Sequence, residues 1–443
     1  MLQPLYTADE MRAAEEGHDV EELMERAGRA VADEVLRRYP DARRIVGVCG
    51  GGANGGDGRI ALRVLREAGR DAEEGHDLDD ADVVLDALFG TGFQGRPRAE
   101  AAEQIERINA AGAPVVAVDL PSGVDASTGE VAGAAVFADY TVTFLGLKVG
   151  LEVAPGRFHA GDVVVADIGL AARDTEHHRV TREVLRLVRR RQPGDNKYTA
   201  GSVLVLGGAP GLTGAACLTA EAAFRADAGY VAVVAPAESL PVLELRLLEA
   251  VKRPIEEVFE AAERAGSLAL VPGLGEGREA LVRHLLSESD LPAVVDADGL
   301  RGLEPFERAA PTVLTPHEGE LGRLLGEKSS WVAAHRLEAV RRAVERFRCV
   351  VLLKGTDTLV GAPGSGVLVV SPGPPSLATA GTGDVLTGVI AAFLAKGLEA
   401  SFAAAAGTAA QQLAATLVPH QVGLVASDVI THLPEALEEH ASI

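Results

Sequence analysis

The sequence predicts an α/β protein of two tandem domains, and three observations support this. Its 443 residues exceed the size at which a single hydrophobic core stops growing. Short apolar segments alternate with helical stretches over residues 45–170, and a second alternation begins at residue 203. Residues 171–192 between them are polar and carry no strand signal. We therefore expect a first domain over 1–175, a linker with a connecting helix over 176–192, and a second domain over 193–443.

Each expected strand is a short apolar run of the kind that is buried on both faces of a parallel sheet. In the first half these runs are 45–49, 83–89, 115–120, 139–144 and 163–170. In the second half they start at residues 203, 231, 268, 293, 312 and 350, and helical segments separate most of them. Both halves are thus predicted to be helix-covered parallel sheets.

Composition excludes several classes of protein. A formal net charge of −22 repels polyanions, so we expect no nucleic-acid partner. The three cysteines are far apart and lie in apolar segments, which indicates neither a disulfide framework nor a zinc cluster and favours a reducing cytoplasm. No apolar run approaches the length of a membrane span, and the N-terminus lacks the pattern of an export signal, so we expect no membrane association.

A glycine-rich loop with unusual polar residues joins the first strand to a helix. Glycines let a ligand approach the backbone closely, and free N–H groups at a helix start attract phosphate. Asn54 and Asp57 lie inside this loop, while Asp86, Asp119 and Ser122 follow later strands. In open parallel sheets ligands bind outside the carboxyl ends of the strands, so these side chains are expected to converge there. Taken singly, each also suits a helix cap or a turn.

In the second half, the segment AGTGD at 380–384 immediately precedes an apolar helix. Backbone N–H groups at such a helix start can hold a phosphoryl group, and Asp384 stands where a base could take a hydroxyl proton. Asp384 would serve equally well as a helix cap. The strand at 350–353 runs into KGTDT at 354–358, which offers an ammonium and two hydroxyls suited to nucleotide phosphates.

The first half resembles the NAD(P)H-hydrate epimerase family. The segments that carry the resemblance are ELMERAG at 22, GANGGDG at 52, DALFGTG at 86, DLPSGVD at 119 and TFLGLKVG at 143. By this resemblance the domain is a Rossmann-like three-layer sheet, and Asn54, Asp86 and Ser122 are potassium ligands. The resemblance also implies a hydrate-binding set of Ala53, Asn54, Gly55, Gly56, Asp57, Gly90, Thr91, Gly92, Phe93, Gln94, Gly95, Arg96 and Asp119.

Two departures from the family pattern bear on this half. Ala53 stands where the family usually has asparagine, which removes one side-chain contact. Residues 70–81 are a short acidic loop where the family normally has another strand and helix. A degenerate, nucleotide-sensing epimerase half is therefore one alternative interpretation.

The second half resembles the ribokinase-like superfamily, and within it the ADP-dependent NAD(P)H-hydrate dehydratases. KGTDT and AGTGD carry the first resemblance, and NKYTAG at 196, TGAA at 213, VPGLG at 271, VDADGL at 295 and TPHEGE at 315 carry the second. The resemblance implies that Ala215, Gly275, His317 and Asp384 bind the hydrate and that Asp384 is the catalytic base. It implies that the nucleotide is bound by Lys354, Gly355, Thr356, Asp357, Thr358 and Gly383.

Together the two resemblances imply a bifunctional repair enzyme for hydrated NADH and NADPH, with epimerisation at C6 followed by dehydration of the S epimer. They imply K⁺ in the first domain, Mg²⁺ in the second, and ADP as co-substrate with ATP as the other possible donor. A homo-oligomer is expected. The alternative from the same fold is a small-molecule kinase of the hydroxyethylthiazole or sugar type, which would release a stable phosphorylated product.

Overall fold

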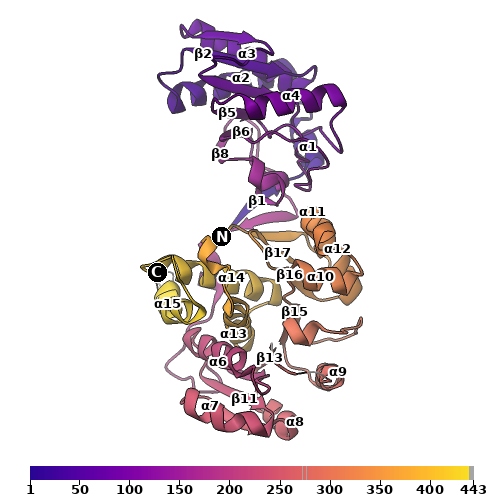
Figure 1. Cartoon of the computed structure of the whole chain (residues 1–443), viewed down its shortest axis with the longest axis vertical. Coiled ribbons are helices and arrows are strands. Elements are labelled where there is room, and N and C mark those ends of the chain that lie inside the picture. The colour runs from indigo at the N-terminus through magenta and orange to yellow at the C-terminus, as the bar shows by residue number, and fades with distance from the viewer. Residues whose placement is uncertain (272, 276, 439–443) are drawn as a thin grey trace. The chain divides into compact units, whose positions relative to one another are not determined.

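A computed structural model of the chain describes residues 1–271, 273–275 and 277–438, which form two compact units. The N-terminal unit holds residues 4–178 and 333–335, and the C-terminal unit holds the other described residues. Each unit has a sheet with helices packed on it (Figure 1). The predicted fold class, α/β in two tandem parts, is confirmed.

The N-terminal unit is built on a six-stranded parallel sheet in the order β3-β2-β4-β5-β6-β8. Its strands are β2 (Arg44–Cys49), β3 (Asp71–Glu74), β4 (Val83–Ala87), β5 (Val115–Val118), β6 (Tyr140–Phe144) and β8 (Asp162–Ala166). Its helices are α1 (Ala8–Glu15), α2 (Val20–Arg38), α3 (Ala53–Glu67), α4 (Ala99–Ala110), α5 (Val149–Glu152) and η1 (Gly156–His159). Outside this sheet, Leu5 of β1 (Leu2–Tyr6) pairs in parallel with Leu147 of β7 (Leu147–Lys148).

Alternation along β4 explains the three layers of this unit. Val83 and Leu85 are buried in the cluster that contains Leu62 and Leu65 of α3, whereas Val84 is buried in the cluster that contains Ile105 of α4. Because successive strand residues point to opposite faces, one apolar run builds both cores. This is why the buried strands read as unbroken hydrophobic segments in the sequence.

The acidic segment 70–81 differs from the loop that the sequence predicts. Residues Asp71–Glu74 form the edge strand β3, which pairs with β2 although most of its side chains are exposed. Backbone hydrogen bonds hold an edge strand whose residues lack an apolar pattern, so periodicity could not reveal it. The segment continues to β4 without a helix.

The C-terminal unit is built on strands in the order β12-β11-β10-β13-β14-β15-β16-β17-β18. The pairs up to β16 are parallel, and β16–β17 and β17–β18 are antiparallel. The bounds are β10 (Ser202–Leu206), β11 (Tyr230–Ala235), β12 (Val251–Pro254), β13 (Ser267–Leu270), β14 (Ala293–Val295), β15 (Thr312–Leu314), β16 (Val350–Leu353), β17 (Thr358–Gly361) and β18 (Val367–Val370).

Helices of the C-terminal unit pack on this sheet, and α13 contacts α6, α14 and the strands β13 and β14. They are α6 (Thr213–Arg225), α7 (Leu240–Arg246), α8 (Val258–Ala262), α9 (Glu279–Glu288), α10 (Glu318–Leu325), α11 (Ser329–Ala334), α12 (Arg336–Phe347), α13 (Thr382–Ala395), α14 (Ala400–Leu417) and α15 (Ala426–Glu438), with short η3 (Ala237–Ser239), η4 (Ile255–Glu257), η5 (Ala297–Leu300) and η6 (Pro375–Leu377). Among the described residues, every helix is too short or too polar to cross a lipid bilayer.

The segment expected as a polar linker, 176–192, has structure of its own. It contains β9 (His177–Val180) and the 3-10 helix η2 (Arg182–Leu187) rather than a connecting α-helix. Val184 and Leu185 are fully buried in the main core of the C-terminal unit. The C-terminal unit therefore begins at Arg179, before the boundary expected at 193.

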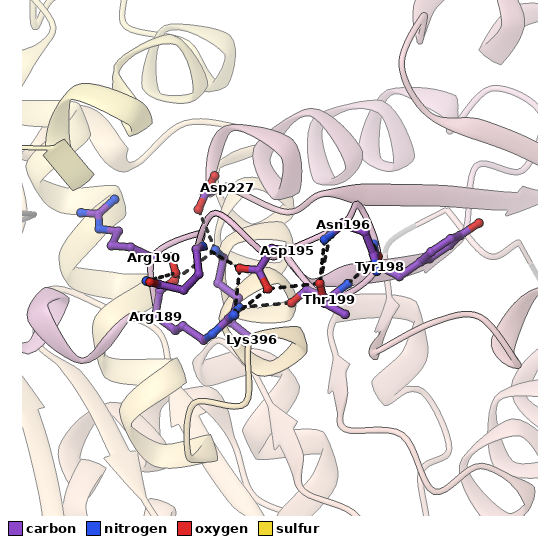
Figure 2. A network of polar contacts seen from close by, with 9 residues as sticks. Arg189, Arg190, Asp195, Asn196, Tyr198, Thr199, Asp227 and Lys396 are labelled. Atoms are coloured by element: carbon purple, nitrogen blue, oxygen red, sulfur yellow. Dashed lines mark hydrogen bonds and ion pairs between the residues drawn. The ribbon is translucent and has the colours of Figure 1, made fainter.

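A polar network fastens the residues after η2 to the C-terminal unit (Figure 2). Arg189 forms a bidentate ion pair with Asp195 at 2.7 and 2.8 Å. Buried Lys396 donates to the Arg189 carbonyl at 3.2 Å and to Asp227 at 2.7 Å. The NKYTAG segment at 196–201 lies in this network just before β10, at the amino end of the strands. This segment is thus a structural feature. It lies at the amino ends of the strands, whereas the polar residues of the candidate sites lie at the carboxyl ends.

Candidate functional site

Asp86 and Ser122 meet at the carboxyl edge of the N-terminal sheet. Asp86 lies in β4 and is fully buried, while Ser122 follows the neighbouring β5. Ser122 Oγ donates to Asp86 Oδ1 at 2.6 Å and the Ser122 amide donates to Oδ2 at 2.7 Å; the Leu88 amide also reaches Oδ1, at 3.3 Å. Burial outweighs these bonds and raises the pKa of Asp86 to about 6.

Asn54 adjoins the loop that follows β4. It is the second residue of α3, and its buried Nδ2 has no hydrogen-bond partner among the described residues. A Cβ placed on Gly90 would lie 3.0 Å from Asn54 Oδ1, so the two segments touch and glycine at 90 leaves the needed room. Asn54 and the Asp86–Ser122 pair therefore flank the same loop.

Asp57 and Asp119 form a second cluster, with a buried lysine. Asp119 adopts a left-handed φ of +67° and accepts from Lys148 Nζ at 2.7 Å and from Thr143 Oγ1 at 3.1 Å. Lys148 is fully buried. Burial, followed by the charges of Asp119 and Glu15, raises the pKa of Asp57 to about 8. A protonated carboxyl and a carboxylate–ammonium pair thus lie in one site at neutral pH.

Sequence reasoning did not select Lys148 and Glu15. Lys148 stands in the segment TFLGLKVG, and a lone lysine within so apolar a run was the available signal. Glu15 ends α1 in an ordinary amphipathic pattern, which gives no hint of its role. In the structure its pKa is raised by burial and by the charge of Asp119.

The remaining expected hydrate-binding residues lie at the surface of the N-terminal unit. Ala53 is exposed at the start of α3, and Gln94, Gly95 and Arg96 are exposed in the loop after β4. Phe93 of this loop stacks on Phe89 with ring centroids 4.7 Å apart. Thr91, Gly92 and Gly56 are half-buried or exposed, whereas Gly55 packs so closely that a Cβ there would lie 1.9 Å from the Gly50 carbonyl.

The C-terminal unit has a cavity of about 970 Å³. It is lined by the first residues of α10 and α13, by the segment after β16, and by residues of α14. Of the residues that the sequence predicts, the cavity brings together His317, Lys354, Gly355, Thr356, Thr358 and Gly383. Carboxyl ends of parallel strands and helix N-termini thus meet around one space, which suits an anionic ligand.

Two carboxylates hold the Lys354 ammonium. Asp296, which is buried, accepts from Lys354 Nζ at 2.6 Å and from Thr387 Oγ1 at 3.3 Å. Glu320 Oε2 lies 4.0 Å from the same Nζ. Asp296 and Glu320 belong to the segments VDADGL and TPHEGE, but sequence reasoning used these as family markers and did not select the two side chains. Their closeness to Lys354 arises from strand order, which the sequence does not state.

Asp384 lies in the first turn of α13 beside this group. A Cβ on Gly383 would lie 3.5 Å from both Asp296 Oδ2 and Lys354 Nζ, which places the helix start against the lysine. Burial and the nearby charge of Asp296 raise the pKa of Asp384 to about 7, while Lys354 acts in the opposite direction. Asp384 caps no amide of its own helix; the N-cap position is Gly381, with a φ of +90°.

Four residues that the sequence assigns to the hydrate or the nucleotide are not among the residues that line the cavity. The carboxylate of Asp357 is buried and pairs with Arg336 at 3.0 Å, so only its main chain can face a nucleotide. Ala215, Gly275 and Asp384 are not among the residues that line the cavity. Gly275, with a φ of +83°, packs against Ala209 near the start of α6. Pro272 of the VPGLG segment lies outside the described residues.

His317 caps the helix that starts at the cavity. Its Nδ1 accepts from the Gly319 amide at 2.9 Å, and its own amide donates to Glu320 Oε2 at 2.9 Å. More than half of the His317 side chain is exposed. The capping box fixes the imidazole while leaving Nε2 directed towards Glu320, at 3.4 Å.

Comparison with known proteins finds a matching family model for each half of the chain. Residues 203–438 match the family model described as NAD(P)H-hydrate dehydratase, and residues 20–74 and 69–150 match that of the YjeF-related protein N-terminus. The bifunctional NAD(P)H-hydrate repair enzyme of Moorella thermoacetica is 35% identical, over 94% of this chain and 92% of that protein.

Solved structures match the C-terminal unit. The ADP/ATP-dependent NAD(P)H-hydrate dehydratase of Bacillus subtilis, crystallised with ATP and Mg²⁺, is 27% identical with a TM-score of 0.54, covering 59% of this chain and 97% of that one. A ribokinase-like superfamily protein of Enterococcus faecalis is 22% identical with a TM-score of 0.54, covering 61% and 99%, and supports the fold alone. The C-terminal unit is therefore ribokinase-like, and the whole chain belongs to the family of bifunctional NAD(P)H-hydrate repair enzymes.

Proposed function

We propose that the protein repairs hydrated NADH and NADPH, with an epimerase in the N-terminal unit and a nucleotide-dependent dehydratase in the C-terminal unit. The observation that carries the proposal is the position of Asp384, which lies beside Lys354 and the glycine turn of α13. Its pKa is about 7. A base near neutrality, a lysine and a phosphate-binding helix start are the groups that a phosphoryl transfer to a hydroxyl requires.

Dehydration then proceeds by making the C6 hydroxyl a good leaving group. Asp384 takes the proton of that hydroxyl as the hydroxyl oxygen attacks the terminal phosphoryl group of ADP, and the bond from that phosphorus to the bridging oxygen breaks to release AMP. Lys354 and the amides at the start of α13 stabilise the phosphoryl charge. Phosphate leaves C6 and a proton leaves C5, which restores the double bond of the dihydronicotinamide. His317, Ala215 and Gly275 are assigned to the hydrate, and Gly355, Thr356, Thr358 and the main chain of Asp357 to the nucleotide.

The chemistry of the cavity fits Mg²⁺, which proteins bind through one or two carboxylates together with substrate phosphates. Glu320 Oε2 lies 4.0 Å from Lys354 Nζ and also accepts from the His317 amide at 2.9 Å, so this carboxylate lies next to the cavity lining. Mg²⁺ bound in the cavity would neutralise charge on the transferred phosphoryl group. The named relative from Bacillus subtilis was crystallised with ATP and Mg²⁺, which supports either ADP or ATP as donor.

The N-terminal unit supports epimerisation by proton transfer at the C6 hydroxyl. Asp57, protonated at neutral pH because its pKa is about 8, can donate to the departing hydroxyl. Asp119, paired with Lys148, can take a proton from the water that adds back to the other face. Addition on the opposite face inverts C6, and the loop Gly90–Arg96 and residues Ala53–Asp57 are assigned to binding the hydrate.

Asn54, Asp86 and Ser122 form a donor set that fits K⁺. A carboxylate offers about four acceptor positions, and Asp86 uses three of them for hydrogen bonds from Ser122 and Leu88. One position on Oδ2 remains. Asn54 would bind the ion through its Oδ1, which faces the loop at Gly90, because its Nδ2 is a hydrogen-bond donor. Bound there, K⁺ would offset negative charge beside the dinucleotide phosphates.

The cellular location and the oligomeric state also belong to the proposal. Three free cysteines, Cys49, Cys217 and Cys349, support a reducing, cytoplasmic location. The exposed apolar side chains of Leu245 and Leu248, 86% and 81% accessible, support a homo-oligomer through the C-terminal unit.

One incubation tests the proposed function. The protein is mixed with both hydrate epimers, K⁺, Mg²⁺ and either ADP or ATP, and absorbance of the reduced nicotinamide band is followed. Full recovery of absorbance from both epimers is expected. A stable phosphorylated product would instead indicate a small-molecule kinase, and hydrate binding without turnover would indicate a sensing protein.

A further inference from the structure

Arg336 is a buried guanidinium that contacts two loops of the C-terminal cavity. It is the first residue of α12 and is 3% exposed. Its Nη1 donates to Glu318 Oε1 at 2.6 Å, its Nη2 donates to the Asp357 carbonyl at 2.7 Å, and its Nε lies 3.0 Å from Asp357 Oδ1. One side chain thus holds a carboxylate on one loop and both a carboxylate and a carbonyl on the other.

The two loops carry different parts of the site. We call residues 315–320 the hydrate loop; they include His317 and the first turn of α10. We call residues 354–358, which include Lys354, the nucleotide loop. Both contribute to the lining of the cavity. The main chains meet where the Lys354 amide donates to the Pro316 carbonyl at 2.9 Å. Arg336 adds a second connection, between Glu318 and Asp357.

The geometry requires an arginine. A Cβ on Gly355 would lie 2.5 Å from Arg336 Nη2, so the guanidinium packs directly against the main chain of the nucleotide loop. A planar fork with five donors can reach Glu318 and both acceptors of Asp357 at once, whereas a lysine ammonium is a single point of charge. Lysine at this position would keep the charge and lose the link.

Protein stability alone explains the contact of Arg336 with Asp357 but not its contact with Glu318. The Asp357 carboxylate is 1% exposed, so breaking its pair with Arg336 would leave a buried charge. The Glu318 carboxylate is 39% exposed and faces the cavity. An ion pair with so accessible a partner is screened by solvent and contributes little to folding. The Glu318 contact therefore needs another explanation.

We infer that Arg336 is a positioning residue, which holds the hydrate loop through Glu318 in fixed relation to the nucleotide loop through Asp357. The inference rests on the proposed function, since it assigns the hydrate to one loop and the nucleotide to the other. Displacing one reactant by about 1 Å can slow a reaction about a hundredfold while each ligand still binds. Loss of the link is thus expected to lower kcat and to leave the separate affinities nearly unchanged.

The main test uses Glu318→Gln, which keeps the buried Arg336–Asp357 pair and so preserves the fold. Its kcat for dehydration is expected to fall about tenfold or more, with KM for the hydrate and Kd for ADP within about twofold of the wild type. Arg336→Lys is expected to lose kcat to a similar or greater degree. The double variant is expected to be no slower than Arg336→Lys alone, because both changes remove one link.

The matched control lies on the same helix. Arg342 of α12 pairs with Glu327, just after α10, at 3.1 Å, and neither residue is among those lining the cavity. Arg342→Lys and Glu327→Gln should therefore keep wild-type kinetics. Unchanged kcat in Glu318→Gln would overturn the inference. So would additive losses in the double variant, or a raised KM with normal kcat, because these would mean that Glu318 contacts a ligand itself.

Amide hydrogen exchange separates this inference from the proposed function. Exchange in residues 315–320 is expected to be faster in Glu318→Gln than in the wild type, with no substrate present. If the wild type showed no dehydration, the proposed function would fail while the exchange result still tested the link. Identical exchange in both proteins would contradict the link whatever the activity.

Discussion

Burial decides the protonation state of individual carboxyl groups in this protein. Asp57, Asp86 and Asp384 are all buried beside the strand ends, and burial raises the pKa of each. Asp195 shows the opposite behaviour, since its hydrogen bonds with Arg189 lower its pKa to about 2. Asp57, Asp86 and Asp384 thus lack a cation able to offset their desolvation.

Replacing Asp384 with Asn is predicted to abolish the base while keeping size and shape. The single-turnover rate of dehydration at saturating ADP and hydrate should fall roughly 10²-fold or more. Ligand binding should change far less, and epimerisation by the N-terminal unit should be unaffected. Full dehydratase activity in this variant would remove Asp384 from the mechanism and leave the glycine turn a binding role only.

The pH dependence of dehydration should follow the same group. Because Asp384 must lose its proton to act and its pKa is about 7, kcat/KM should rise with pH to a plateau above that value. Stability has the opposite sign. Between about pH 4 and 7 the folded state binds a proton that the unfolded chain has lost, so stability falls as pH rises. Asp384→Asn should therefore melt at an equal or higher temperature than the wild type at pH 8, as thermal unfolding can check.

Asp86→Asn is predicted to weaken the potassium site with little change in volume. The neutral amide attracts K⁺ less strongly, so epimerisation and its dependence on K⁺ should decline together. Dehydration of the S epimer should proceed at the wild-type rate, which serves as the internal control. The measurement is the rate of epimer interchange across a K⁺ titration, and an unaltered titration would refute the ligand assignment.

At the scale of elements, the Lys396–Asp227 pair is predicted to fasten the turn after α6 to the end of α13. Asp227 adopts a φ of +70°, which asparagine also tolerates, so Asp227→Asn removes charge without backbone strain. The Lys396 side chain is 1% exposed and would keep only a carbonyl partner. A loss of about 1–3 kcal/mol in unfolding free energy is expected, discounted for the partial exposure of Asp227.

Denaturant unfolding at neutral pH measures this loss. Asp195→Asn is the control, because the cation it releases in the same network, Arg189, is 41% exposed whereas Lys396 is 1% exposed. Its cost should be clearly smaller. Equal costs for the two variants would mean that burial of Lys396 does not set the strength of the pair.

Sequence patterns predict some elements and not others for physical reasons. The buried strands β4 and β5 appear as apolar runs because both of their faces are covered. Edge strand β3 has mostly exposed side chains and no such run. Glycine turns and strand-end acids marked both sites, but Lys148, Asp296 and Arg336 gain their roles from partners far away in the chain. Such pairings depend on strand order and loop packing, which local patterns do not contain.

At the scale of the whole molecule, each unit has its own core and its own site. The core around Val31 and Leu62 belongs to the N-terminal unit, and the larger core around α13 and α14 belongs to the C-terminal unit. Units with separate cores can fold independently. Epimerisation and dehydration are therefore expected to be separable activities, joined by a chain that lets one unit supply the epimer that the other consumes.

The C-terminal unit is predicted to need the residues from Arg179 onwards to fold stably. A fragment of residues 179–443 keeps Val184 and Leu185, both fully buried in its core, whereas a fragment of residues 188–443 loses them. Burial of each such side chain contributes about 1.5–3 kcal/mol, a large share of the roughly 5–15 kcal/mol that stabilises a typical domain. The longer fragment should fold and dehydrate only one epimer; the shorter should unfold at a markedly lower denaturant concentration. If the two unfolded alike, the segment after Arg179 would be a linker after all, and if the longer one cleared both epimers rapidly, the division of labour would be wrong.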